Sequence, residues 1–151
     1  MPRSHIQYVR KTDLARNTRR VIRDVQRGQV AVVESHGQPE VAIMDIIDYR
    51  IQRAFIHYYT QDSVVSEQND VSDEAFINIT DEQSLFDQVL AFYLADVISL
   101  GRMSELLKLP QFDLRLRFSR LGIPLRTGPQ TKEEAEQDIE NALNFIEKRD
   151  S

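Results

Sequence analysis

The first sixty residues combine short apolar runs with one amphipathic segment. Over residues 12–27 the apolar positions recur at intervals of three and four, which is the spacing of one face of a helix. We expect Thr12 to cap the start of this helix and Gly28 to end it in a left-handed conformation. A short strand is expected before it, at residues 8–10. The positions expected to be buried on the helix are Leu14, Thr18, Val21, Ile22 and Val25.

Two apolar runs follow this helix directly. Residues 30–33 read Val-Ala-Val-Val and residues 41–44 read Val-Ala-Ile-Met, while residues 35–39 between them favour a turn. This arrangement is typical of a β-hairpin. A second helix is expected from Asp45 to about Tyr58. Residues 1–60 are therefore expected to form a small α+β unit.

The rest of the chain shows helical spacing only. Residues 61–80 are polar and acidic and mostly without a period, so we interpret them as a linker. Residues 81–151 are expected to form an all-α region, which makes the whole chain α+β with two domains. Four helices are expected in that region, over residues 81–98, 102–108, 112–121 and 131–148, with residues 99–101 interrupting between the first two.

The formal net charge of −5 hides a strong segregation of charge. Residues 1–60 hold ten Lys and Arg against six Asp and Glu, whereas residues 61–100 hold nine acidic residues and no basic one. Residues 101–130 are basic again, and residues 131–151 are acidic. A polyanion therefore meets basic surface on this chain despite its overall negative charge.

The amphipathic segment is unusually rich in arginine. Between Leu14 and Arg27 lie five arginines and one aspartate, and most of the arginines fall off the apolar face. A solvated charged face is the plainer interpretation. The excess of one sign nevertheless favours binding to phosphates. Because the helix and hairpin are too small to form an independent core, we expect the unit to dimerise.

Several motifs within residues 6–58 together resemble the Phd/YefM family of bacterial antitoxins. They are the Thr-Asp-Leu-Ala-Arg-Asn-Thr run at 12–18, the Gly28 stop, the strand entry at 37–43 and the pair Asp48-Tyr49. The resemblance implies a β-α-β-β-α unit that dimerises, binds a palindromic operator and represses its own operon. It also implies a second, C-terminal segment that neutralises a toxin. Many members carry a DNA-contacting arginine at the position of Ala15, so neighbouring basic residues would take over its role here.

We expect the DNA contacts to come from the basic residues at the start of the unit and from one asparagine. Among them, Asn17 is the residue expected to reach a base edge or to fix the register. The full set is Arg10, Lys11, Arg16, Asn17, Arg19, Arg20 and Arg23.

Within residues 93–124, the expected helices 102–108 and 112–121 and the short turn between them have the size of a helix-turn-helix, or of two helices in an ordinary bundle. The runs Ser-Leu-Gly-Arg at 99–102 and Leu-Gly-Ile-Pro at 121–124 are similar to a small family of helix-turn-helix-like prokaryotic proteins linked to PIN-domain ribonuclease toxins. The resemblance implies contact with such a toxin, while the arginines of residues 115–120 leave contact with DNA open. The residues expected to contact the toxin are Phe86, Leu90, Tyr93, Arg115 and Phe118.

The sequence offers no organised catalytic or metal-binding motif. The three histidines share no ligand spacing, the chain has no cysteine, and neither a nucleophile elbow nor a phosphate-binding glycine loop is present. We therefore expect no enzyme, no metal and no cofactor. No apolar run approaches the roughly 20 residues that span a bilayer, and the first residues lack a signal-peptide pattern. The expected location is the cytoplasm, without membrane contact.

The leading hypothesis is a dimeric antitoxin that binds operator DNA and a cognate toxin. The acidic stretch 61–87 and the helix 131–148 are either solvated or packed on their own chain, or they contact that toxin. One alternative is a stand-alone transcriptional regulator in which both basic blocks bind DNA. The other is a protein-interaction adaptor whose arginines only decorate the surface.

Overall fold

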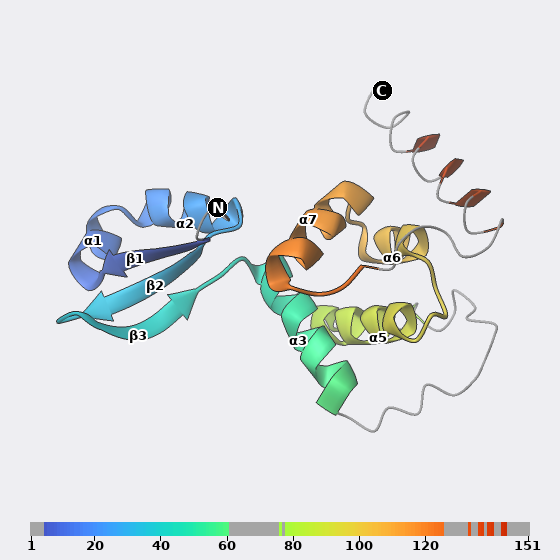
Figure 1. Ribbon diagram of the computed structural model, residues 1–151, viewed down its shortest axis with the longest axis horizontal. Coiled ribbons are helices and arrows are strands. Elements are labelled where there is room, and N and C mark those ends of the chain that lie inside the picture. The colour runs from blue at the N-terminus through green and yellow to red at the C-terminus, as the bar shows by residue number, and fades with distance from the viewer. Residues whose placement is uncertain are drawn as a thin grey trace. The chain divides into compact units, whose positions relative to one another are not determined.

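The computed structural model describes residues 5–60, 76, 78–125, 133, 136–137, 139–140 and 143–144. These residues hold three strands and six helices, so the fold is α+β as predicted (Figure 1). Contacts divide the chain into two units, Met1–Tyr49 and Arg50–Ser151. Most of the predicted linker and much of the predicted helix 131–148 lie outside the described residues. None of the helices in the described part combines the length and apolarity needed to cross a membrane.

The N-terminal unit is built on a three-stranded sheet in the order β1-β2-β3. β1 (Ile6–Arg10) pairs in parallel with β2 (Val30–Ser35), which pairs antiparallel with β3 (Gln38–Ile43). The two residues of the hairpin turn, His36 and Gly37, both have positive φ (53° and 75°). Such turns match the twist of the flanking strands, and the predicted hairpin is confirmed.

The crossover from β1 to β2 is helical, but it is not the single helix that the spacing predicts. α1 (Lys11–Arg16) and α2 (Thr18–Gln26) are separated at Asn17, whose φ of −123° and ψ of 35° are not helical. The hydroxyl of Thr18 donates to the carbonyl of Leu14 at 2.7 Å, a local bond that competes with the backbone ladder and bends helices. The prediction that Thr12 caps the helix is also wrong, because α1 already begins at Lys11 and Arg10 occupies the N-cap position.

The core of this unit lies between α1, α2 and one face of the sheet (Figure 1). Leu14 and Ile43 pack against this core from its margin. Ile22 is 40% exposed and Thr18 is exposed, so the predicted buried face is narrower than its spacing suggests. Gly28 has the positive φ (105°) expected where α2 ends. The buried core residues are Val9, Val21, Val25 and Ala31.

α3 (Ile46–Thr60) starts at the predicted place. The carboxylate of Asp45 accepts hydrogen bonds from the backbone N–H groups of Ile47 and Asp48 at 3.0 and 3.3 Å, which caps the helix. The division between the units falls after Tyr49, whereas the sequence suggests an N-terminal unit that runs to residue 60. From Arg50 onward the helix is tied to the helical unit by an ion pair of 3.1 Å between Arg50 and Glu82.

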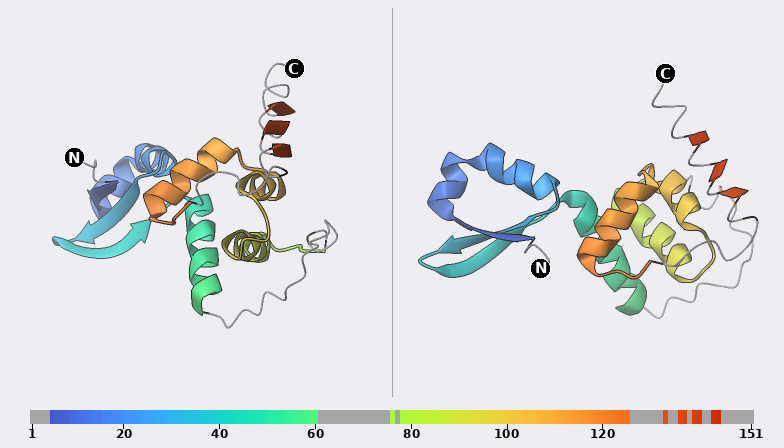
Figure 2. Two further views of the ribbon diagram at one scale, coloured as in Figure 1. Left: turned by 45° about the vertical axis from the view of Figure 1, so that its right-hand side comes forward. Right: turned by 45° about the horizontal axis from the view of Figure 1, so that its top comes forward.

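Three further helices complete the second unit, namely α5 (Glu82–Leu94), α6 (Leu100–Leu107) and α7 (Gln111–Leu121). Figure 2 shows α5 lying beside α3. α5 ends four residues before the predicted Ile98, and Asp96 adopts a left-handed φ of 63° just after it. Ser99 does not interrupt a helix; its hydroxyl accepts the N–H of Arg102 at 3.0 Å and so caps α6.

The turn between α6 and α7 is fixed by two local features. Lys108 ends α6 in the left-handed region with a φ of 55°, and the hydroxyl of Ser104 donates to the carbonyl of Leu109. The core of the unit is aromatic and aliphatic, and the rings of Tyr93 and Phe118 meet edge to face with centroids 5.8 Å apart. Its most deeply buried members include Leu90, Tyr93, Met103, Leu114 and Phe118.

Candidate nucleic-acid interface

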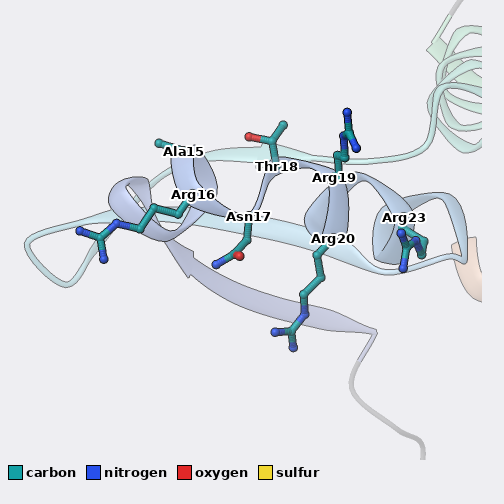
Figure 3. A pocket seen from close by; sticks show the side chains of 7 residues that line it. All are labelled: Ala15, Arg16, Asn17, Thr18, Arg19, Arg20 and Arg23. Atoms are coloured by element: carbon teal, nitrogen blue, oxygen red, sulfur yellow. The ribbon is translucent and has the colours of Figure 1, made fainter.

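Four arginines and one asparagine gather where α1 meets α2, and we call this set the basic surface. All five side chains are exposed. With Ala15 and Thr18 they line a shallow depression of about 430 Å³ (Figure 3). Its members are Arg16, Asn17, Arg19, Arg20 and Arg23.

Asn17 forms the junction between the two helices that carry these side chains. The N–H of Asn17 donates to the carbonyl of Asp13 at 2.9 Å, and the carbonyl of Asn17 accepts from Val21 at 3.1 Å, so the residue joins the end of one helix to the start of the next. Figure 3 shows Asn17 and Arg20 projecting on one side of the segment and Arg19 on the other. Positive charge is therefore spread around the segment rather than confined to one side.

The first turn of α2 adds to this positive field. Within the described residues, no backbone hydrogen bond ties the N–H groups of Thr18, Arg19 or Arg20 to α1. Unpaired N–H groups at the start of a helix carry partial positive charge. The arginine side chains and the backbone of α2 thus favour an anion at the same place.

The predicted DNA-contacting residues differ in how far their charge is already neutralised. Arg10 pairs with Asp13 at 3.5 Å, and Lys11 pairs with Glu40. In the part of the chain that the structure describes, Arg16, Arg19 and Arg23 have no carboxylate within ion-pair distance. Arg20 has only a long contact of 4.0 Å to Asp24. The unneutralised charge therefore lies on the basic surface rather than at the start of α1.

The sheet has a second face, opposite the one that α1 and α2 cover, and we call it the open sheet face. Side chains alternate along a strand, so Ile6 and Tyr8 of β1 point away from the buried Val9. Ile6 is 47% exposed and Tyr8 is 65% exposed. The register places Ile6 beside Val30, Tyr8 beside Val32, and Val32 beside Ala42. The result is a continuous apolar strip across all three strands.

Four of the five residues predicted to contact a toxin are buried, although a contact with a partner requires exposed side chains. Tyr93 and Phe118 are at most 1% exposed, and Phe86 and Leu90 are also buried. These four side chains build the core of the helical unit, so a partner of the folded unit would meet other residues. Only Arg115 of the predicted set is exposed. The apolar residues Phe112 and Leu116 of the same helix are exposed, and they were not among the predicted contacts. The four-residue interval between them is the signal in the sequence that could have identified them.

The basic surface is suited to binding anions and holds no group arranged for covalent chemistry. Among the described residues, no three His, Asp or Glu side chains come together as metal ligands. Comparison of the chain with protein-family models, with curated proteins and with solved structures finds no match.

Proposed function

We propose that the N-terminal unit binds duplex DNA as a dimer through the basic surface. We further propose that the chain is an antitoxin of a two-gene system, which represses its own operon and neutralises a cognate toxin without catalysis. The observation that carries the DNA proposal is the set of exposed arginines around the Asn17 break. Three of them have no carboxylate partner in the described part of the chain.

Arginine side chains bind phosphates without reading sequence, and they position a protein on the duplex. Asn17 lies among them and offers both a donor and an acceptor, which suits it to reach a base edge or to fix the register. A two-fold dimer presents two such surfaces, as a palindromic operator requires. If each dimer neutralises about six to eight phosphates, log affinity should fall with log salt at a slope of about −5 to −7.

The open sheet face supports the dimer. Its exposed apolar residues, Ile6, Tyr8 and Ala42, form one strip with the partly buried Val30 and Val32, and the exposed Arg10 lies at the end of β1 on the same face. Contiguous exposed apolar surface on a small unit marks an interaction site. A two-fold axis through this strip would bring identical apolar rows together, because such an interface is self-complementary.

The antitoxin part of the proposal rests on the resemblance to the Phd/YefM family and on charge. The observed order β1, α1, α2, β2, β3, α3 is compatible with that family's unit if the broken helix counts as one. Residues 61–100 carry nine acidic residues and no basic one. A ribonuclease toxin, such as the PIN-domain class that the second resemblance implies, has a basic substrate groove that such a segment complements.

The DNA proposal is tested by titrating a labelled duplex from the chain's own promoter with the purified full-length protein over a salt series. A slope of about −5 to −7 is expected. The triple variant Arg16→Ala, Arg19→Ala, Arg23→Ala should bind far more weakly, whereas Arg115→Ala in α7 should bind normally. A slope near zero would reject DNA binding and leave an adaptor as the better description.

The antitoxin proposal is tested by co-expression with the product of the adjacent gene, followed by pull-down and a growth assay. A neighbour that is toxic alone and is captured and silenced by this chain supports the proposal. If the chain binds its promoter but no neighbouring product is toxic, it is a stand-alone regulator instead.

A further inference from the structure

α7 is apolar on two opposite sides. Leu114 and Phe118 are fully buried in the core of the helical unit, whereas Phe112 is 73% exposed and Leu116 is 45% exposed. Phe112 and Leu116 are four residues apart, so they lie one above the other on one face of the helix. Arg115 is exposed beside them. We call these three residues the α7 face.

A second exposed face has the same spacing and the opposite charge. The described residues between 133 and 144 are helical, and among them Ile139 is 62% exposed and Leu143 is 56% exposed. These two residues are also four positions apart, and the exposed Glu140 lies beside them. We call these three residues the C-terminal face.

We propose that the α7 face of one copy packs against the C-terminal face of a second copy, with the two helices antiparallel. In an antiparallel pair, residues at the same height have numbers with a constant sum, because both helices rise 1.5 Å per residue. The register that sets Leu116 level with Ile139 also sets Phe112 level with Leu143. It sets Arg115 level with Glu140. One alignment therefore matches both apolar positions and the charged position.

The charges of the two segments agree with this alignment. Residues 101–130 hold six Lys and Arg against two Asp and Glu, whereas residues 131–151 hold three against seven. Opposite charges along two facing helices attract, whereas two copies of the α7 face, or two copies of the C-terminal face, would repel. Contact between unlike faces is therefore favoured over contact between like faces.

A second copy is the occupant because the chain does not cover these faces itself. Phe112, Leu116, Ile139 and Leu143 are all exposed within one chain. Each copy supplies one α7 face and one C-terminal face, so two copies can exchange them around a two-fold axis and close the assembly with two identical contacts. The contact uses neither the basic surface nor the open sheet face, and it is independent of the proposed DNA binding.

Because the chain has no cysteine, introduced cysteines are the only thiols that a cross-linker can join. Full-length Leu116→Cys and Ile139→Cys variants, one of them carrying a size tag, are mixed and treated with a short bis-maleimide. The expected product is a mixed dimer joined between positions 116 and 139. The matched control replaces Leu116→Cys by Gln88→Cys, which places the thiol at an exposed position of α5. A yield no higher than this control overturns the proposal.

Two further measurements distinguish a contact between two copies from a contact within one copy. A chain that carries both Leu116→Cys and Ile139→Cys should give covalent dimers. If the two cysteines of a single chain are cross-linked to each other at high dilution, the contact lies within one copy and the proposal is overturned. Arg115→Glu should lower the mixed yield about twofold at low salt, and Glu140→Lys on the other partner should restore it. An unchanged yield with Arg115→Glu alone would contradict the alignment.

Discussion

The two units bury side chains of very different size. The buried core of the N-terminal unit consists of valines and one alanine, whereas that of the helical unit contains Tyr93, Phe118, Leu90 and Met103. Burial of a large side chain stabilises a fold by roughly 1.5–3 kcal/mol, and the smaller side chains give less. The helical unit is therefore stabilised by its own core.

The N-terminal unit gains less from its interior and leaves apolar side chains exposed on one face of its sheet. Tyr8, its largest side chain on the open sheet face, is 65% exposed. A small unit with a thin core commonly depends on a partner. The difference agrees with the dimer that we propose for the N-terminal unit, whereas the helical unit already has a core of large side chains.

The largest expected effect is on the core of the helical unit. Phe118→Ala should lower the free energy of unfolding by about 3–5 kcal/mol, because it removes a ring from a site with no exposure. The matched control is Phe112→Ala on the same helix, measured at a dilution where the chain is monomeric; there the ring is 73% exposed and the cost should stay within about 0.5 kcal/mol. Urea denaturation followed by circular dichroism measures both. Equal costs would refute the division of α7 into a core side and an outer side.

A smaller effect is expected at the open sheet face. Tyr8→Glu should raise the dissociation constant of the proposed dimer at least tenfold, because the carboxylate would be buried against an apolar strip without a partner. Gln26→Glu introduces the same charge at an exposed position of α2 and should leave the dimer intact. Sedimentation velocity over a concentration series measures both, in chains that also carry Leu116→Glu to remove the separate contact proposed for the α7 face. If Tyr8→Glu dimerises as well as Gln26→Glu, the interface lies elsewhere.

The next effect concerns a single arginine of the basic surface. Arg19→Ala should reduce the magnitude of the salt slope of DNA binding by about 2, one phosphate contact being lost from each subunit of the dimer. Arg115→Ala removes an exposed arginine from the helical unit and should leave the slope unchanged. A stand-alone regulator would bind DNA through residues 1–60 and also through residues 101–130. It therefore predicts that Arg115→Ala reduces the magnitude of the salt slope as well. Fluorescence anisotropy at several salt concentrations separates the two.

The hairpin and the stop at Gly28 could be predicted from the sequence because each depends on local chemistry. A glycine with positive φ and a turn between two apolar runs require no distant contact. The break at Asn17 could not be predicted in the same way. Apolar positions continue at helical spacing on both sides of it, and one non-helical residue does not disturb that pattern. The basic surface therefore contains a break in the helical backbone that the spacing of apolar residues does not reveal.

The candidate partner-binding residues of the helical unit show a second limit. Phe112 and Phe118 are both apolar residues of one helix, yet one is exposed and the other is fully buried. Periodicity identifies apolar positions but does not tell which of two faces packs against the rest of the unit. Tertiary packing makes that choice, so Tyr93 and Phe118 looked like partner contacts although they form the core.

The smallest expected effect tests the cap of α5 in the helical unit. The N–H and the hydroxyl of Ser84 both donate to the Asp81 carboxylate at 2.8 Å. These bonds, with a smaller contribution from the charge of Arg50, lower the pKa of Asp81 below its ordinary value. A lowered folded-state pKa stabilises the fold above the unfolded pKa of about 3.9, and this contribution is lost as the pH falls through the folded value.

Asp81→Ala should therefore lower the melting temperature slightly at pH 7 and at pH 5, and the difference from the unmodified chain should shrink as the pH falls below about 4. Asp81→Asn is the matched control, because asparagine also caps helices but does not ionise. Its melting temperature should stay closer to that of the unmodified chain and lack this acid dependence. Thermal denaturation at pH 7, 5 and 3 distinguishes the variants. If Asp81→Ala shows the same deficit at all three values, the carboxylate contributes no ionisation-linked stability, and the cap acts through its neutral hydrogen-bonding geometry alone.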